Sequence, residues 1–284
     1  MNDGGGTLFV VATPIGNLGD VTTRAVETLR ACDRVVAEDT RRTRQLLTHL
    51  GIAGKPVDRL DAHATEGDCA RLVEKLVAGE RVALVTDAGT PGVSDPGERV
   101  VEAAVAASVR VVPIPGASAV LAALVASGLA GDGRFRFLGF LPRDGSERRQ
   151  ALALATETPE TVILFEAANR TAATLRELAE VTPDRTACVA RELTKLHEEL
   201  ARGTCSALAA DGREWIGEIA IVLGPHEPGA REAAIDDAAI DARIDEALAR
   251  GDHAKTVAER LAAWSGRPRR EIYERVISRK AART

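Results

Sequence analysis

Residues 81–97 read RVALVTDAGTPGVSDPG, and this segment contains a complete turn from a strand to a helix. Its first part, Arg81–Thr86, is a continuous apolar run without polar alternation, which predicts a strand buried on both faces. Twelve residues rich in glycine and proline follow, Thr86–Gly97, and Glu98–Ala107 then carries apolar residues at helical spacing. A buried strand joined by a turn to a helix is the building unit of an α/β fold.

The same unit occurs on both sides of this segment in the first part of the chain. Short apolar runs predict further strands, and segments with apolar residues at i, i+3 and i+4 separate them as predicted helices. Strands that are covered on both faces in this way form a largely parallel sheet. The predicted strands are Leu8–Ala12, Arg34–Ala37 and Val109–Val112, and the predicted helices are Val21–Ala31, Thr43–Leu50 and Cys69–Ala78.

Two breaks divide the chain. The first is Pro113-Ile114-Pro115-Gly116, because two prolines and a glycine continue neither a strand nor a helix, and the second is Gly224–Gly229. We therefore predict an α/β domain over residues 1–113, a second α/β domain over 114–226 and a helical C-terminal module over 227–284. The expected elements after the first break are strands Arg134–Leu138, Thr161–Phe165, Thr186–Ala190 and Glu218–Leu223, helices Leu121–Ser127, Glu147–Ala155, Thr171–Val181 and Ser206–Ala210, and, in the module, helices Asp236–Ala249, His253–Trp264 and Arg269–Lys280.

The predicted fold class is thus α/β, with two domains built on mostly parallel sheets and a small helical module. A length of 284 residues fits two domains of about 100–150 residues each. Hydrophobic residues at 45% and charged residues at 28% are ordinary for a globular protein and exclude a disordered chain. Aromatic residues at only 3% argue against a protein that reads nucleic acid by stacking bases on aromatic platforms.

Cysteine usage and hydropathy predict a cytoplasmic protein. Cys32, Cys69, Cys188 and Cys205 are scattered, without C-x-x-C spacing or a histidine at zinc-site spacing, so we expect buried thiols in a reducing compartment and no metal site. The first six residues lack the basic and apolar regions of a signal peptide. No window approaches 18 uninterrupted apolar residues, so we expect no membrane span.

The net charge of −5 excludes a protein that is basic all over, but the charge is unevenly distributed. Residues 253–284 carry a net charge of +6, whereas residues 227–252 carry −5. A reversal of sign this sharp predicts a C-terminal surface that faces a polyanion. The alternative is an ordinary solvated helical face, which the charge pattern alone leaves open.

Standard nucleotide-binding motifs are absent, because the chain has neither G-x-G-x-x-G nor G-x-x-x-x-G-K-[ST]. Three turns rich in glycine and proline follow predicted strands instead, at Thr13–Asp20, Thr86–Gly97 and Pro113–Ser118. The carboxyl ends of parallel strands share one edge of a sheet, and ligands bind in the crevice at that edge. Glycine lets the backbone approach a ligand closely, and proline reduces the entropy lost on binding. We therefore predict that Thr86–Gly97 binds a ligand.

Six motifs stand in a fixed order along the chain: LFVVATPIGNL at 8–18, AEDTR at 37–41, DAGTPGVSDPG at 87–97, PIPG at 113–116, GFLP at 139–142 and RELTK at 191–195. Together they resemble the ribosomal RNA small subunit methyltransferase I family of the tetrapyrrole-methylase superfamily. The resemblance covers residues 7 to about 224, and the tail fits the short C-terminal module of that family.

The resemblance implies a homodimeric enzyme that uses S-adenosyl-L-methionine and methylates the ribose 2′-hydroxyl of one cytidine in the decoding region of 16S rRNA, either as free rRNA or in the small subunit. It also implies that the cofactor lies in the cleft between the two α/β domains. The residues that the resemblance places around the cofactor are Pro14, Asp87, Ala88, Gly89, Val93, Ser94, Ala117 and Ser118, with Leu141, Phe165, Glu166, Glu218 and Ile219 near the adenosine.

The chemistry of such a reaction needs a group that helps the ribose hydroxyl to attack, either a base or a cationic neighbour. Four polar residues follow two of the predicted strands and are expected at the sheet edges where the cofactor turns emerge. The alternative for each is a structural salt-bridge network with neighbouring arginines. These candidate catalytic residues are Glu38, Asp39, Glu192 and Lys195.

Arginine-rich segments are candidates for RNA binding, because the guanidinium group pairs well with phosphate. They are Arg41, Arg42 and Arg44 after the second strand and Arg267, Arg269 and Arg270 in the tail. Two other functions remain open: a small-molecule methylase of the same superfamily that acts on a corrin or porphyrin precursor, and a non-catalytic RNA-binding assembly factor. The arginines favour RNA over a macrocycle, and the intact turns at 13–20 and 86–97 favour an enzyme.

Overall fold

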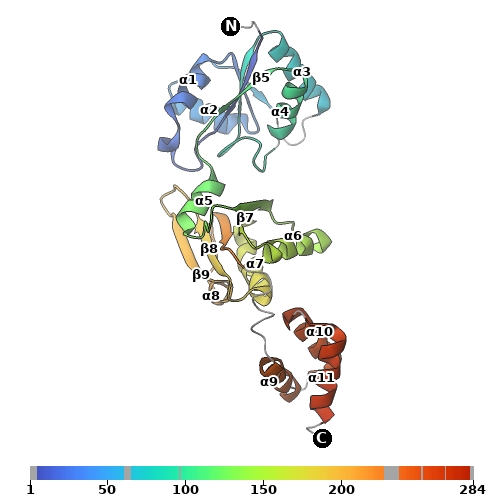
Figure 1. Cartoon of the computed structure of the whole chain (residues 1–284). Helices are drawn as coiled ribbons and strands as arrows, with labels where there is room; N and C mark the ends of the chain where they lie inside the picture. The colour runs from blue at the N-terminus through green and yellow to red at the C-terminus, as the bar shows by residue number, and fades with distance from the viewer. Residues whose placement is uncertain are drawn as a thin grey trace.

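The computed structural model describes residues 5–60, 65–95, 97–226, 237–250, 252–265 and 267–281. Two α/β units, each with a five-stranded sheet, and a helical unit follow one another along the chain (Figure 1). The predicted α/β class and the helical C-terminal segment are confirmed. The exact boundaries after residues 113 and 226 stay a prediction, and residues 227–236 of the predicted module lie outside the described residues.

The first sheet is parallel throughout, as its continuous apolar strands predict. Its strand order is β3-β2-β4-β1-β5, so the predicted turns that follow β1 and β4 emerge next to one another. The strand β3 was not predicted, because its three residues, VDR, contain no apolar run. The strands are β1 (Thr7–Val11), β2 (Arg34–Ala37), β3 (Val57–Arg59), β4 (Arg81–Val85) and β5 (Arg110–Ile114).

Helices cover both faces of this sheet. Leu29 of α1 and Leu47 of α2 belong to the core on one face, and Leu72 of α3 and Val100 of α4 belong to the core on the other. Side chains of Thr22, Asp39 and Thr65 cap the first three helices by accepting a hydrogen bond from a backbone N–H of the first turn. The helices are the 3₁₀ turn η1 (Leu18–Asp20), α1 (Thr23–Ala31), α2 (Thr40–His49), α3 (Glu66–Val77) and α4 (Gly97–Ala106).

The prediction of a mostly parallel sheet is wrong for the second unit. Its strand order is β6-β7-β10-β8-β9, and only β6 and β7 pair in parallel, whereas the other pairs are antiparallel. A continuous apolar run indicates that a strand is buried on both faces. An antiparallel sheet that is covered by helices on both faces therefore has the same kind of strand sequence as a parallel sheet. The strands are β6 (Phe135–Phe140), β7 (Thr161–Ala167), β8 (Thr186–Arg191), β9 (Glu199–Thr204) and β10 (Glu218–Leu223).

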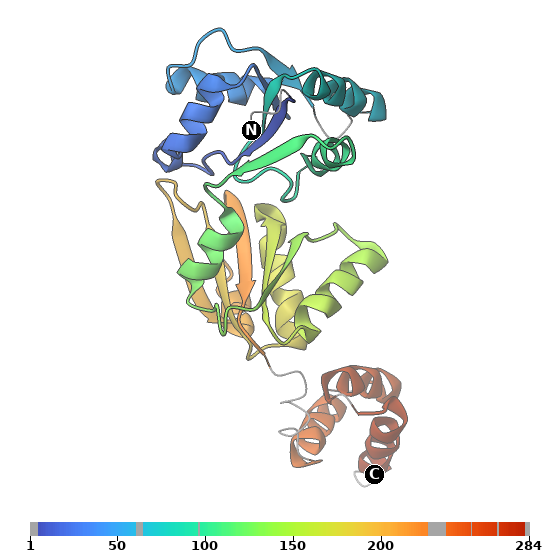
Figure 2. The same ribbon diagram turned by 45° about the horizontal axis from the view of Figure 1, so that its top comes forward.

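Helices again lie on both faces of the second sheet (Figure 2). Leu175 of α7 and Leu208 of α8 belong to the core on one face, with Leu152 of α6 packed against them, whereas Leu124 of α5 belongs to the core on the other. The strand β9 was not predicted, because its sequence ELARGT contains no continuous apolar run. The helices are α5 (Ala119–Ser127), α6 (Gly145–Glu157), α7 (Ala168–Val181) and α8 (Cys205–Ala210).

The C-terminal helices α9 (Asp237–Ala249), α10 (Ala254–Ser265) and α11 (Arg269–Ala281) have a core of their own that includes Ile240, Leu261 and Ile272. Basic residues of α11 pair with acidic residues of α9 across this core. Their contacts include Arg275–Asp241 at 2.6 Å, Arg279–Asp241 at 2.8 Å and Arg275–Asp237 at 2.9 Å. The positive and negative stretches of the sequence therefore neutralise one another to a large extent, which weakens the prediction of a strongly basic surface.

None of the helices in the described part of the chain is long and apolar enough to cross a lipid bilayer.

Candidate active site

A cavity of about 420 Å³ lies between the carboxyl edge of the first sheet and one edge of the second sheet. Residues that follow β4 form one part of its wall, and the ends of β7 and β8 with the start of β10 form another. This volume lies in the range of small-molecule sites. Its lining residues are Ile15, Glu38, Thr86, Asp87, Ala88, Val93, Ser94, Asp95, Ala119, Phe140, Phe165, Glu166, Ala167, Ala190, Leu193, Gly217, Glu218, Ile219 and Ala220.

The turn after β4 is held against the turn after β1. Thr13 and Gly89 exchange two backbone hydrogen bonds, of 2.8 and 3.0 Å, and the Thr13 hydroxyl donates to the carbonyl of Thr86 at 3.1 Å. Gly89 adopts a φ of +85°, which glycine reaches without steric cost. Asp95 Oδ1 closes the turn by accepting from the backbone N–H groups of Gly92 and Gly97. The two turns therefore form one ordered wall.

Many of the residues predicted around the cofactor line this cavity. Others support the wall from behind: Gly89 and Ala117 hold the turn, Ser118 caps α5, and Leu141 is buried in the core of the second unit. Pro14 lines a neighbouring hollow of about 220 Å³ instead. The predicted residues that line the cavity are Asp87, Ala88, Val93, Ser94, Phe165, Glu166, Glu218 and Ile219.

A further set of lining residues was not named among the candidate site residues of the sequence analysis. Most of them are small or apolar side chains on strands and turns. In the sequence, apolar residues that line a cavity look the same as apolar residues of a protein core. The available signals were the motifs, which contain Ile15, Asp95, Phe140 and Leu193, and, for the strand residues, their position near strand ends. They are Ile15, Ala119, Phe140, Ala167, Ala190, Leu193, Gly217 and Ala220, together with the polar Thr86 and Asp95.

The polar part of the wall is acidic, since Glu38, Asp87, Asp95 and Glu218 all line the cavity. Asp87 is partly neutralised by Arg42, whose Nη1 lies 3.6 Å from Asp87 Oδ2. Asp95 Oδ2 is buried and has no hydrogen-bond partner among the described residues. A buried carboxylate oxygen without a partner is costly, so this atom is available to accept a hydrogen bond from a ligand.

Of the four predicted catalytic residues, Glu38 lines the cavity and Asp39 does not. The Asp39 carboxylate accepts from the backbone N–H of Arg41 at 2.8 Å and pairs with the Arg41 guanidinium at 3.0 Å. Hydrogen bonds from the side chain and the backbone of Arg41 lower the pKa of Asp39 to about 2. The structure thus gives Asp39 a capping role at the start of α2.

Glu192 and Lys195 meet Glu218 at the rim of the cavity. Lys195 Nζ lies 2.8 Å from Glu192 Oε1 and 3.2 Å from Glu218 Oε2. Burial alone would lower the pKa of Lys195, but its hydrogen bonds to the two carboxylates and their charges raise it above the usual value. Lys195 therefore stays a cation at neutral pH. Glu38 and Glu218 line the same cavity.

The loop that carries Lys195 reaches across to the first unit. The backbone N–H of Asn17 donates to Thr194 Oγ1 at 3.1 Å, and a side chain at Gly16 would collide with Lys195, because an added Cβ would lie 2.4 Å from Lys195 Cγ. Glu192 and Thr194 adopt φ values of +50° and +69°, which are strained for residues other than glycine. Such strain is typical of functional loops that their surroundings hold in place.

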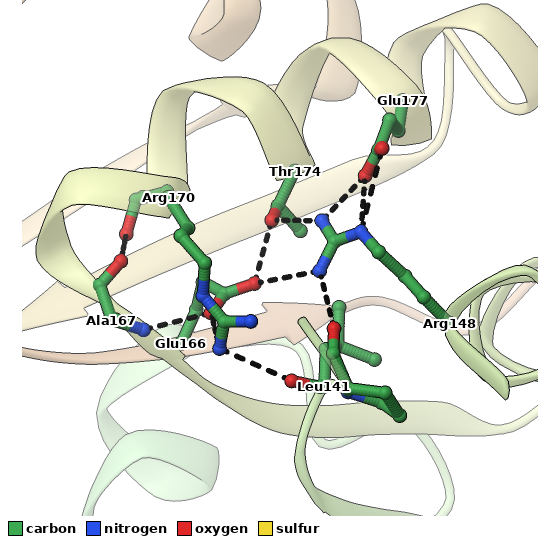
Figure 3. A network of polar contacts seen from close by, with 9 residues as sticks. Leu141, Arg148, Glu166, Ala167, Arg170, Thr174 and Glu177 are labelled. Carbon is green, nitrogen blue, oxygen red and sulfur yellow. Dashed lines mark hydrogen bonds and ion pairs between the residues drawn. The ribbon is translucent and has the colours of Figure 1, made fainter. Parts of the chain in front are cut away.

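Glu166 lines the cavity and is the centre of a buried ionic network (Figure 3). Its fully buried carboxylate contacts Arg170 at 2.5 Å, Arg148 at 3.4 Å and the Thr174 hydroxyl at 2.7 Å. Arg148 also binds Glu177 at 2.5 Å. The network joins β7, α6 and α7, so it fixes the end of β7 that lines the cavity.

The arginines predicted to bind RNA are exposed to different extents. The side chains of Arg41 and Arg42 are 85% and 63% exposed, and Arg44 is also exposed on α2, next to the cavity. In the C-terminal unit, Arg267, Arg269 and Arg270 each pair with acidic residues of the same unit. The basic surface beside the cavity therefore comes from α2. Among the described residues, no group of histidine, cysteine or acidic side chains could hold a metal ion.

Comparison with known proteins places these features in context. A family model described as Tetrapyrrole (Corrin/Porphyrin) Methylases matches residues 7–209. Ribosomal RNA small subunit methyltransferase I of Synechocystis sp. is 43% identical over 272 residues, which make up 95% of this chain and 96% of that protein. The protein of the same name from Halalkalibacterium halodurans is 40% identical over 277 residues, covering 95% and 94% of the two chains.

Solved structures share the fold at lower identity. Uroporphyrin-III-C-methyltransferase from Thermus thermophilus has a TM-score of 0.55 at 20% identity and covers 77% of this chain and 94% of its own. Diphthine synthase has a TM-score of 0.57 at 19% identity, with coverages of 77% and 90%. These likenesses support the fold assignment.

Proposed function

Since the chain belongs to the tetrapyrrole methylase family, and within it to the family of ribosomal RNA small subunit methyltransferase I, we propose that it is an S-adenosylmethionine-dependent methyltransferase of small-subunit rRNA. The finer proposal is that it methylates the ribose 2′-hydroxyl of a cytidine in the decoding region of 16S rRNA. The observation that carries the proposal is the extent of the likeness, which covers about 95% of this chain and includes the C-terminal unit.

The cavity fits a positively charged nucleoside cofactor. Its acidic residues suit a ligand with a sulfonium and an ammonium group, and the buried Asp95 Oδ2 is an acceptor without a partner among the described residues. Apolar strand residues such as Ala190 and Ala220 offer a dry surface for a flat ring. S-adenosylmethionine would supply an electrophilic methyl group in this site. The residues that would hold it are those of the wall, including Asp87, Asp95 and Ile219.

Glu38 is the best candidate for the proton acceptor. It follows β2 directly and lines the cavity with Thr86 and Asp95, whereas Asp39 is engaged at the start of α2. A ribose hydroxyl is a weak acid, and a carboxylate within reach can accept its proton as the oxygen attacks. Lys195 and Glu192 act differently in this proposal, as positioning residues, because the Lys195 ammonium holds the Glu218 carboxylate at the cavity rim.

We expect Glu38→Gln to reduce single-turnover methylation of rRNA at least tenfold, which corresponds to about 1.4 kcal/mol of barrier. The amide keeps the shape of the side chain but accepts no proton, so calorimetry is expected to show unchanged affinity for S-adenosylmethionine. Wild-type turnover in this variant would remove Glu38 from the reaction. If Asp39→Ala loses turnover instead, without a lower melting temperature, the proton acceptor is Asp39, as the sequence pattern also allowed.

The remaining parts of the proposal concern partners. The exposed arginines of α2 are proposed to hold rRNA phosphates beside the cavity, with Arg267, Arg269 and Arg270 as further contacts.

A homodimer is proposed because α5 is apolar on all sides and leaves Leu121 and Val125 exposed by 52% and 73%. Sedimentation analysis of the whole chain tests the dimer directly.

Nucleoside analysis of small-subunit rRNA after incubation with the protein and S-adenosylmethionine tests the proposed function. The expected product is 2′-O-methylcytidine at one position, and free rRNA and assembled subunits are compared as substrates. Methyl transfer to a porphyrin precursor but not to RNA would favour the small-molecule methylase. RNA binding without any transfer, in a protein that also fails to bind the cofactor, would favour the assembly factor.

A further inference from the structure

A bulge in β6 turns the ring of Phe140 into the cavity. Phe137 pairs with Ile163 of β7, but Phe140 pairs with Phe165, so three steps along β6 correspond to two along β7. Gly139, with a φ of +68°, takes up the extra residue. In a regular strand Phe137 and Phe140 would face opposite sides of the sheet. The bulge instead brings both rings to Phe165, with centroid distances of 4.9 and 5.3 Å.

Phe140 is the exposed member of this aromatic group. Phe140 is 60% exposed as a residue although it lines the cavity, whereas Phe137 and Phe165 are half-buried. The β6 end also lies close to the turn after β4, because a Cβ added to Gly139 would be 3.4 Å from Ser94 Oγ. Phe140 thus stands where the second sheet and the turn of the first unit approach each other, with its ring open to solvent.

The segment after Phe140 is fixed from behind. Arg170 donates to the carbonyl of Leu141 at 3.1 Å, and Arg148 donates to the carbonyl of Pro142 at 3.0 Å (Figure 3). Both arginines are held in turn by the buried Glu166. These hydrogen bonds fix the backbone that follows Phe140. They therefore also fix the position of the Phe140 ring, although the ring is exposed to solvent.

We propose that Phe140 is the platform on which the base of the acceptor nucleotide stacks, so that its ribose is presented to the cavity. The proposal rests on the proposed function, because it assumes a nucleotide substrate. A single ring suffices to hold one unstacked base, so the scarcity of aromatic residues does not oppose it. Stacking is favoured because an aromatic ring offers a π-face to any base, and single-stranded RNA is commonly held in this way.

The exposure of Phe140 favours the substrate over the cofactor as the stacking partner. A small cofactor that is enclosed by the cavity gains most from buried walls, such as Ile15, Ala190 and Ala220, which are at most 7% exposed. The RNA must approach from solvent, so its base meets the ring that is open to solvent. The exposed Arg42 of α2 pairs with Asp87 of the cavity wall, so this arginine lies beside the cavity.

The test compares four variants of the whole chain: Phe140→Ala, Phe140→Leu, Phe140→Tyr and, as the matched control, Phe135→Leu. Phe135 lies on the same strand and is 40% exposed, but it does not line the cavity. Steady-state methylation of small-subunit rRNA gives kcat and KM for RNA at saturating S-adenosylmethionine, and calorimetry gives the Kd of the cofactor without RNA. Thermal unfolding and sedimentation check that each variant is folded and unchanged in oligomeric state.

We expect Phe140→Ala and Phe140→Leu to raise KM for RNA or lower kcat/KM by about 5- to 150-fold, the range for the loss of one stacked base. Phe140→Tyr keeps the ring and is expected to stay within about threefold of wild type, as is Phe135→Leu. A weaker affinity for the cofactor in Phe140→Ala, with unchanged KM for RNA, would assign the ring to the cofactor and overturn the proposal.

Two further outcomes would also overturn it: wild-type kinetics in Phe140→Leu, which would show that any apolar side chain serves, or a change of oligomeric state in Phe140→Ala, which would assign the ring to a protein interface. A failure of the proposed function is distinct, because the wild-type protein itself would then transfer no methyl group to rRNA while still binding the cofactor.

Discussion

Glu166→Ala is expected to lower the free energy of unfolding by about 3–5 kcal/mol, because it leaves Arg170 without its carboxylate partner and Arg148 with Glu177 alone in a largely buried site. The Glu166 side chain is fully buried, and the side chains of Arg148 and Arg170 are only 9% and 24% exposed. The Arg170 Nη1 atom already has no hydrogen-bond partner among the described residues. Loss of Glu166 would therefore leave further donors of Arg170 without an acceptor. Urea-induced unfolding followed by circular dichroism measures the change.

Glu177→Ala provides the matched control for this variant. Glu177 also pairs with Arg148, but its side chain is 41% exposed, so solvent can replace the lost contact and we expect a change of about 1 kcal/mol or less. Glu166→Gln, which keeps the hydrogen-bonding shape, is expected to fall between the two. Similar stabilities of Glu166→Ala and Glu177→Ala would show that the buried network contributes no more than a surface ion pair.

Gly89→Val is expected to weaken the binding of S-adenosylmethionine at least tenfold and to abolish methyl transfer at ordinary cofactor concentrations. Gly89 has a φ of +85°, a conformation that is strained for a β-branched residue. A Cβ at this position would lie 3.4 Å from Ile15 Cγ2, so the larger valine side chain would press on a residue of the cavity wall. The backbone bonds of Gly89 to Thr13 would be disturbed at the same time. Calorimetric titration with the cofactor checks this.

Gly51→Val separates backbone strain from damage to the cavity. Gly51 has a φ of +65° at the end of α2, and an added Cβ would meet no other atom within 4 Å. This variant is expected to lose stability, since it carries the same kind of strain, and to keep the cofactor affinity of the wild type. Equal affinity in Gly89→Val and wild type would remove the turn after β4 from the binding site.

The first sheet could be predicted because its strands and turns each carry a strong local signal. Continuous runs such as Leu8–Ala12 and Arg81–Thr86 require burial on both faces, and the glycine and proline of the turns mark where the strands end. The three-residue β3 gave no such signal, because it exists through pairing with β2 rather than through its own sequence. This strand therefore forms because of a tertiary contact, the pairing with β2.

The second sheet shows the limit of the same reasoning. The sequence of a strand indicates whether the strand is buried, but not whether its neighbours run parallel or antiparallel to it. The apolar runs at Thr161–Phe165 and Glu218–Leu223 are therefore compatible with both kinds of pairing. The site was predictable where motifs mark turns, as at Asp87 and Ser94. It was not predictable where apolar residues such as Ala190 and Ala220 line the wall, because no local pattern distinguishes a cavity wall from a core.

The place of β10 in the second sheet has a consequence for biosynthesis. This strand is the last of the sheet to be made, yet it lies between β7 and β8, and it bonds to both. While a ribosome is still making the chain, β7 and β8 have no shared partner, and the cavity lacks Gly217, Glu218, Ile219 and Ala220. The second sheet and the cavity can therefore be completed only after Leu223 has left the exit tunnel. The insertion of β10 between β7 and β8 then joins the two parts of the sheet in one step.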